Sequence, residues 1–168
     1  MSYQTIELKP ATSAGLDFDL EPYYALTVDK ICQASLNEEM MPLTETAMHN
    51  EHLYGMAMVG SWVTPRGNHI QRVLSYAAVT GFVEHPWGKL AEVGSVITLP
   101  EERLKGYGTS VVGMVLKLAS TKAALAEHGH TGFIAKCNVD SVGMFAGKLG
   151  FSQEGNNEAG QAIMLKHL

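Results

Sequence analysis

The residue types and spacing that could do chemistry come together in one stretch of the chain, residues 103–109. Its two glycines, Gly106 and Gly108, stand one residue apart, which lets the backbone bend sharply and approach a ligand closely. The stretch follows an expected strand and opens an expected helix, so the free N–H groups of the first helical turn would point outward at the positive end of the helix dipole. Such an arrangement binds phosphate or pyrophosphate, and Arg103 and Lys105 would add positive charge.

Two other phosphate-binding patterns do not fit this stretch. A Walker-A loop needs Gly-Lys-Ser/Thr after its spacer, and that sequence is absent. A dinucleotide-binding fingerprint needs a third Gly or Ala three residues after the second glycine, where Val111 stands. The stretch therefore indicates a phosphate-containing ligand of another class.

A second group that could do chemistry is Glu92, which lies within an otherwise apolar expected strand. A charged side chain is costly to bury there without a purpose or a partner. A carboxylate in such a place can accept the proton that an ammonium group must lose before it becomes a nucleophile. The alternatives are that Glu92 points to solvent or pairs with a strand neighbour such as Arg72 or Lys89.

Histidines and cysteines give weaker signals. His49 and His52 stand on one side of an expected helix, and His128 and His130 flank a glycine, but neither pair has a third ligand at metal spacing. We therefore expect no metal. Cys137 lies on an expected buried strand and is predicted to be a core residue rather than a nucleophile.

These groups need elements to hold them, and the apolar pattern predicts an α/β fold with a mixed sheet. The expected strands cover residues 5–9, 56–63, 72–83, 90–99, 133–137 and 161–165. Turn residues at 64–68 and 85–88 join three of these strands into an antiparallel meander. One helix is expected to begin at Pro22, and others to cover 43–52 and 141–148. A long helix follows Gly108, with apolar residues at helical spacing to Ala126 and Gly129 as its stop.

Length and composition are those of an ordinary folded domain. The chain has 168 residues, of which 46% are hydrophobic and 17% charged, so we expect a single domain over residues 1–168. No apolar stretch approaches the ~20 residues of a membrane span, and the first residues show no signal-peptide pattern. The two cysteines form no disulfide framework, which favours a reducing, cytoplasmic location.

Charge is distributed unevenly along the chain. Residues 1–51 hold nine acidic and two basic side chains, whereas residues 52–168 hold eight acidic and ten basic ones. The acidic part is either a solvated helix surface or a surface that favours a cationic or neutral ligand. No basic run and no basic–aromatic alternation occurs, so we expect no nucleic-acid partner.

Two blocks of the sequence resemble the GNAT superfamily of N-acetyltransferases. The strand, Arg103-x-x-Gly106-x-Gly108 and the helix after it are similar to the acyl-CoA signature of that family. Residues 138–141 (Asn-Val-Asp-Ser) and 148–151 (Lys-Leu-Gly-Phe) are similar to the family's exit from strand five and the helix that follows. The blocks have the family's order and spacing, and the resemblance covers residues 89–152.

The resemblance implies a GNAT-like fold, in which a mixed, mostly antiparallel sheet of six to seven strands is flanked by helices and splayed between strands four and five. Acetyl-CoA would lie in that cleft, with its pyrophosphate on the loop amides and its acetyl carbonyl near a strand-four amide. An amine would lose its proton to Glu92 and attack the thioester directly. The implied cofactor-binding residues are Val96, Ile97, Thr98, Arg103, Leu104, Lys105, Gly106, Tyr107, Gly108, Thr109, Asn138 and Ser141.

The implied activity is N-acetyl transfer to the primary amine of a small molecule or peptide. No membrane partner is expected, and the resemblance is compatible with a homodimer. Transfer of another acyl chain, transfer to a hydroxyl, and acyl-CoA binding without catalysis are the alternatives. One departure from the family concerns the group that protonates the leaving thiolate. Many members place a Tyr on the helix after strand five, but here the segment is one residue longer and Phe145 or Ala146 occupies that place. A solvent proton or Ser141 would then serve.

Overall fold

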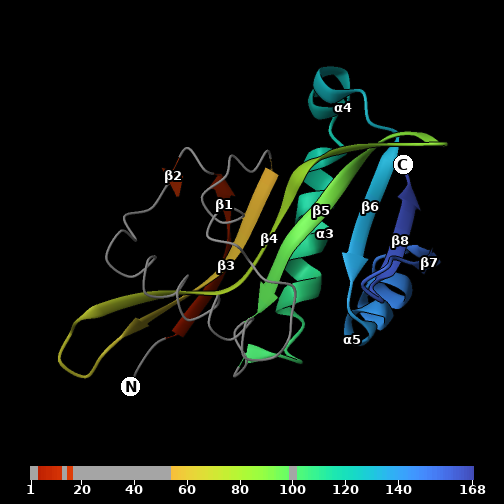
Figure 1. The fold of residues 1–168 in the computed structure, drawn as a ribbon. Helices are drawn as coiled ribbons and strands as arrows, with labels where there is room; N and C mark the ends of the chain where they lie inside the picture. Colours follow the sequence, from red (N-terminus) through yellow and green to blue (C-terminus); the bar gives the residue numbers. More distant parts are fainter. Residues whose placement is uncertain (1–3, 13–14, 17–53, 99–101) are drawn as a thin grey trace.

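A computed structural model describes residues 4–12, 15–16, 54–98 and 102–168 of the chain. The helices expected from Pro22 and over 43–52, and the pair His49 and His52, lie outside these residues. The described strands form one eight-stranded sheet in the order β2-β1-β3-β4-β5-β6-β8-β7. The sheet is mixed and carries helices, which confirms the predicted fold class (Figure 1).

The first half of the sheet is an antiparallel meander of long strands. Its members are β1 (Gln4–Thr12), β3 (Tyr54–Val63), β4 (His69–His85) and β5 (Gly88–Thr98), with the two-residue β2 (Gly15–Leu16) added to the edge of β1. The β4–β5 hairpin closes through Pro86 and Trp87, and the paired residues His85 and Gly88 flank them. The meander of β3, β4 and β5 was predicted, whereas β1 was expected as a strand without assigned neighbours; each of these strands begins before its expected first residue.

The parallel pairing in the described sheet is between β5 and β6 (Gly132–Cys137). It runs from the pair Leu90–Gly132 to the pair Val93–Ala135 and then stops. β5 continues to Thr98, whereas β6 stays paired with β8 (Ala162–His167) as far as Cys137. The two strands therefore fork toward their carboxyl ends, as Figure 1 shows, which confirms the predicted splay. We call the place where their pairing ends the fork.

Helix α3 (Tyr107–Ala119) covers one face of the sheet, behind β4 and β5 in Figure 1. It packs there because its apolar residues recur at helical spacing; Val111, Val112 and Val115 are fully buried. Alternate residues of β5 and β6, including Val93 and Phe133, meet α3 in the main core cluster. On the opposite face Leu90, Ile134 and Leu165 form a separate, smaller cluster.

The helical stretch expected to run unbroken to Ala126 is two helices in the structure. α3 ends at Ala119, and α4 (Lys122–His128) begins after a bend of 69°. Ser120 donates its hydroxyl proton back to the Leu116 carbonyl at 2.7 Å, and Thr121 caps the new helix by accepting from the Ala124 N–H at 3.3 Å. Gly129 has φ 67 and ends α4, as predicted.

The segment after β6 also departs from a plain helix. It consists of the short α5 (Val139–Gly143) and a π-helical turn, η2 (Met144–Lys148). β7 (Ser152–Asn156) then pairs with β8, and this exposed strand was not predicted. The described sheet has eight strands rather than the six to seven expected, because it also contains β7 and the short β2.

Candidate functional site

The loop that enters α3 has the backbone geometry expected of an anion site. Gly106 is the helix N-cap and has φ 83, while Leu104 has φ 65 and a fully exposed side chain. A non-glycine residue at positive φ marks local strain, which is common at ligand sites. No described side chain caps the helix, and its first turn holds no acid, so the N–H groups of Tyr107, Gly108 and Thr109 are left to donate to an external acceptor.

Thr98, the last residue of β5, anchors this loop. Its carbonyl accepts from Arg103 Nε at 3.3 Å, and its hydroxyl shares a 2.8 Å hydrogen bond with the Ser75 hydroxyl of β4. A Cβ on Gly108 would come within 3.3 Å of the Thr98 hydroxyl, so the bare glycine permits the close approach of α3 to β5. The strand end and the helix start are thus held as one unit.

The charged side chains of the loop have protein partners. Lys105 Nζ lies 2.7 Å from Glu102 Oε2, and Glu102 is buried. Arg103 is drawn back onto Thr98. Lys105 is therefore paired with an acidic side chain, whereas Arg103 donates to an uncharged carbonyl and still lines the cleft, where its charge adds to that of the helix terminus.

A cleft of about 470 Å³ opens from this helix terminus to the segment after β6. Its size is within the range of small-molecule sites. It lies beyond the carboxyl ends of the parallel strands β5 and β6, the usual position of ligand sites in such sheets. Its lining consists of Val96, Thr98, Glu102, Arg103, Leu104, Gly106, Tyr107, Gly108, Thr109, Asn138, Asp140, Ser141, Met144 and Lys148.

The cleft brings together most of the cofactor-binding residues expected from the sequence. Lys105 does not line it, because Glu102 engages its ammonium, and the side chain of Ile97 lies outside the described part of the structure. Four lining residues were not expected: Glu102, Asp140, Met144 and Lys148. Met144 and Lys148 follow Ser141 by three and seven residues, a helical spacing that could have identified them.

A β-bulge interrupts β5 beside the cleft. Tyr76 of β4 pairs with Ile97, but Ala78 pairs with Gly94, so β5 holds one residue more than β4 over this step. A bulge leaves backbone groups outside the regular ladder and bends the strand. The extra residue falls at Ser95 or Val96. The family resemblance implied a donor to the acetyl carbonyl at the amide of Val96 or Ile97, so the two positions overlap at Val96.

The π-helical turn η2 decides which side chain faces the cleft after β6. Met144 lines the cleft, whereas Phe145 is buried and packs edge-on against Phe151 at 5.1 Å. Ala146 is exposed and outside the cleft lining. The expectation that Phe145 or Ala146 would face the cleft is therefore wrong, because a π turn accommodates the extra residue and shifts the orientation of its neighbours.

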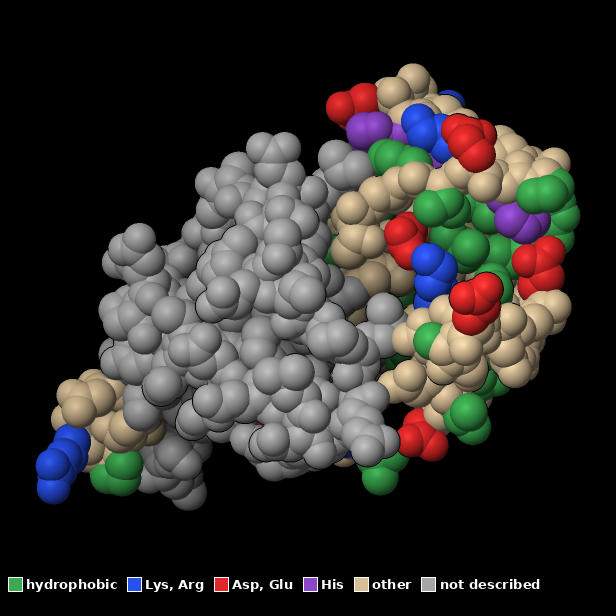
Figure 2. Space-filling view, in the orientation of Figure 1, with side chains coloured by type: hydrophobic (Ala, Val, Ile, Leu, Met, Phe, Trp, Pro, Cys, Tyr) green, Lys and Arg blue, Asp and Glu red, His purple; other side chains and the backbone are tan. Residues whose placement is uncertain are grey.

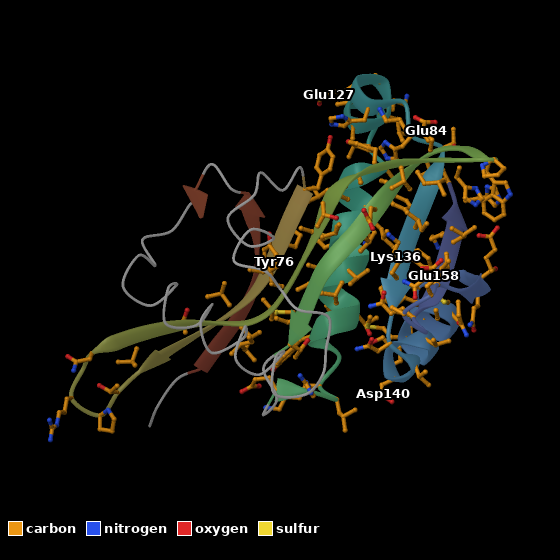
Figure 3. All side chains as sticks on the ribbon, in the orientation of Figure 1. Tyr76, Glu84, Glu127, Lys136, Asp140 and Glu158 are labelled. Carbon is orange, nitrogen blue, oxygen red and sulfur yellow. The ribbon has the colours of Figure 1, made fainter. Side chains whose placement is uncertain are left out.

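Glu92 lies on the sheet face opposite α3 and outside the cleft lining. It alternates with Ala91 and Val93, which pack toward α3. Its side chain is 28% exposed, and its Oε1 is 3.2 Å from Lys136 Nζ on β6. The partner in the described part of the structure is thus Lys136 rather than Lys89, and the side chain of Arg72 is outside that part; Figure 3 shows Lys136 on β6 beside β5. On this face, acidic and basic side chains are interspersed over the described part (Figure 2).

Other candidate groups resolve as structural. Cys137 is a free, buried thiol at the end of β6, and burial raises the pKa of this thiol, which disfavours the nucleophilic thiolate. Within residues 4–12, 15–16, 54–98 and 102–168, no three His, Cys, Asp or Glu side chains are placed to share a metal ion. Nor is any single helix in these ranges long and apolar enough to cross a membrane; α3 and α4 reach that length only together, across their bend.

Comparison by sequence finds no relatives: neither a protein-family model nor a curated protein matches the chain. Comparison of structures finds several. The GNAT domain of S. lividans PAT is similar with a TM-score of 0.61 at 15% identity, covering 99% of this chain and 97% of that one. AtaTR bound to AcCoA is similar with a TM-score of 0.56 at 16% identity, covering 95% and 92%. PaiA N-acetyltransferase from Thermoplasma acidophilum in complex with coenzyme A is similar with a TM-score of 0.52 at 15% identity, covering 98% and 99%.

The structural neighbours overturn one expectation, that nucleic acid is excluded as a partner. They include a KacTA–DNA complex, with a TM-score of 0.55 at 17% identity over 98% of this chain and 93% of that one. AtaT complexed with acetyl-methionyl-tRNAfMet is also similar, with a TM-score of 0.50 at 14% identity over 96% and 95%. The exclusion was wrong because it rested on consecutive residues alone, whereas a fold can gather basic side chains that are distant in the sequence and a partner protein can supply the contacts.

The likenesses are spread over nearly the whole chain and agree with the forked sheet and the helix that starts at Gly106. Because all of them lie well below 25% identity, the fold is what they show. This chain has the fold of the GNAT N-acetyltransferases.

Proposed function

We propose that this chain is an acyl-CoA-dependent N-acyltransferase that moves an acetyl group from acetyl-CoA to a primary amine in a ternary complex. The observation that carries the proposal is the uncapped first turn of α3, which opens into a cleft at the fork between β5 and β6. Oriented backbone N–H groups and an adjacent unpaired strand edge suit a ligand with a pyrophosphate and an extended amide chain.

The residues present fit acetyl-CoA. The N–H groups of Tyr107, Gly108 and Thr109 would bind the pyrophosphate, and the β5 edge at Val96 and Thr98 would pair with the pantetheine amides. Lys148 lines the same cleft and has no recorded ionic partner among the described residues, so its ammonium is placed to balance phosphate charge. Asn138 and Ser141 offer polar groups across the cleft.

Each step of acetyl transfer would be assisted by a group of this chain. The Glu92 carboxylate accepts a proton from the acceptor ammonium, and the neutral amine forms the new C–N bond as the C–S bond of the thioester breaks. A backbone N–H at the β5 bulge donates to the carbonyl oxygen as negative charge develops on it. The departing thiolate takes its proton from solvent or from the Ser141 hydroxyl, since Met144 offers none.

The proposed acceptor is a primary amine, and a panel of candidate amines would identify it. Release of free thiol from acetyl-CoA, measured with polyamines, amino acids, peptides and drug-like amines, distinguishes catalysis from acyl-CoA binding alone. Aminoacyl-tRNA belongs in that panel, because AtaT, a protein of the same fold, has been seen complexed with acetyl-methionyl-tRNAfMet. Hydroxyl acceptors and longer acyl-CoA donors test the remaining alternatives.

The binding part of the proposal is tested by two matched glycine variants. Gly106 and Gly129 both have positive φ, at +83 and +67, and an added Cβ at either meets nothing within 4 Å. Gly106→Val and Gly129→Val therefore carry similar backbone strain, but only the first lies at the cleft. Acetyl-CoA should raise the Tm of the wild type and of Gly129→Val by mass action. The shift should be lost in Gly106→Val.

Comparison of the two variants separates binding from folding. A general loss of stability would lower the Tm of both without acetyl-CoA and leave the ligand-induced shift in both. If Gly106→Val keeps the full shift, the first turn of α3 is not the phosphate site and the proposed function loses its main support.

A further inference from the structure

The ion pair between Glu92 and Lys136 spans the fork. Glu92 pairs with Ile134 in the β5–β6 ladder, and the ladder ends one step later, at Val93 and Ala135. Lys136 is therefore the first β6 residue beyond the ladder, and its ammonium reaches diagonally back to Glu92 Oε1 at 3.2 Å. The contact joins the last part of β5 that is paired with β6 to the first part of β6 that is no longer paired with β5.

The ion pair engages only one oxygen of the Glu92 carboxylate. The next residue of β5 on the same face is Gly94, and a Cβ there would come within 3.0 Å of Thr80, so the Thr80 side chain borders this position. Among the described residues, Oε1 has an ionic partner and Oε2 has none. One carboxylate oxygen is thus held, and the other is left for a second partner.

No other described cation competes for this carboxylate. Lys89, also on β5, lies on the opposite face and sits 4.7 Å from the Phe82 ring. Lys166 of β8 is opposite Phe133, which packs toward α3, and donates to the Leu149 carbonyl at 2.6 Å. The neighbouring β4 residue, Gly81, carries no charge.

We propose that Lys136 is the positioning residue for the proton acceptor: its ammonium, reaching across the fork, fixes the Glu92 carboxylate through Oε1. Oε2 is then presented to the acceptor ammonium, which gives up its proton there before attack. The inference rests on the proposed function, because it assigns the orientation of the group that accepts the proton. Lys136 touches neither reactant and acts through Glu92.

The test compares Lys136→Gln, Lys136→Arg, Glu92→Gln and the control Lys89→Gln in steady-state acetyl transfer across pH. Glu92→Gln should lower kcat by ~10²-fold and remove the acidic limb of the pH–rate profile. Lys136→Gln should lower kcat about tenfold and displace that limb, because the carboxylate loses the charged partner that holds it. Lys136→Arg should restore the limb, and Lys89→Gln should leave it in place.

The Tm shift with acetyl-CoA is measured on the same four proteins and should be unchanged, since none of the three positions lines the cleft. If Glu92→Gln is impaired but Lys136→Gln keeps the wild-type limb, the positioning role is overturned while the proposed function stands. Wild-type turnover in Glu92→Gln ends both the base assignment and the role of Lys136. A limb displaced equally in Lys89→Gln would show a general charge effect and also overturn the proposal.

Discussion

At the scale of the residue, Met144 and Phe145 show how one extra position redirects side chains. Met144 faces the cleft, whereas Phe145 is 2% exposed and packed on Phe151. The two neighbours thus have opposite environments within the same π-helical turn. A phenolic hydroxyl would be tolerated at the first position and would lack a partner at the second.

This contrast predicts opposite outcomes for two tyrosine substitutions. Phe145→Tyr should lower the free energy of unfolding by about 1–3 kcal/mol, because it buries a hydroxyl in the apolar core. Met144→Tyr should leave the free energy of unfolding nearly unchanged and add a proton donor at the cleft, raising kcat where thiolate departure limits the rate. Urea unfolding and thiol-release kinetics measure the two effects. Equal losses of stability in both variants would contradict the assigned orientations.

Sequence patterns located the loop residues of the site better than its side-chain partners. Gly106 and Gly108 were identifiable because their proposed role in phosphate binding depends on backbone freedom, and a closely spaced pair of glycines indicates that freedom directly in the sequence. The contact between Glu92 and Lys136 was not identifiable, because it depends on the register of two strands whose contacting residues are 44 positions apart in the chain. The engagement of Lys105 by Glu102 was missed although they are three residues apart, because the loop geometry brings them together.

At the scale of the element, the bend between α3 and α4 was hidden by a continuous apolar pattern. Ala123 and Ala126 fit the periodicity of the preceding helix, yet both are exposed in α4. Local side-chain hydrogen bonds from Ser120 and Thr121 override that pattern, since they offer the backbone other partners. The strands were predicted more closely, because alternation and turn residues define them locally.

The cap on α4 gives a prediction at this scale. Thr121→Ala removes the hydroxyl that accepts from the Ala124 N–H, so it should lower the free energy of unfolding by about 1 kcal/mol. Thr121→Ser keeps the hydroxyl and should retain most of that stability. Urea unfolding of both variants provides the measurement. The acetyl-CoA-induced Tm shift should be the same in both, because α4 does not line the cleft. Equal stability of the two variants would show that the cap contributes little.

At the scale of the whole molecule, the cleft and the β4–β5 hairpin lie at opposite ends of the sheet. Figure 3 shows Asp140 at the cleft end, and Glu84 and Glu127 at the other. The ligand site therefore depends on the fork, while the far end is closed by an aromatic cluster under α4. That cluster consists of Tyr54, Phe82, His128, His130 and Phe133.

His130 is the buried titratable member of this cluster. Its side chain is 3% exposed, its Nε2 is 2.8 Å from the Ala119 carbonyl at the end of α3, and its Nδ1 has no hydrogen-bond partner among the described residues. Burial lowers the pKa of His130 below its ordinary value; the Ala119 hydrogen bond opposes this shift, and the nearby His128 and Lys89 add to it. The folded protein therefore binds a proton at His130 less readily than the unfolded chain does.

The sign of the resulting pH dependence follows from that difference. Above pH ~6.5 His130 is neutral in both states, so its contribution to stability is fully present there. As pH falls below that value the unfolded chain takes up the proton first, and the free energy of unfolding should decrease until the folded-state pKa is passed. His130→Gln retains a donor for the Ala119 carbonyl but cannot titrate, so it should flatten this part of the curve. Urea unfolding at pH 7.5 and 5.5 measures the effect. A variant that loses as much stability as the wild type between these two values would locate the acid sensitivity elsewhere in the molecule.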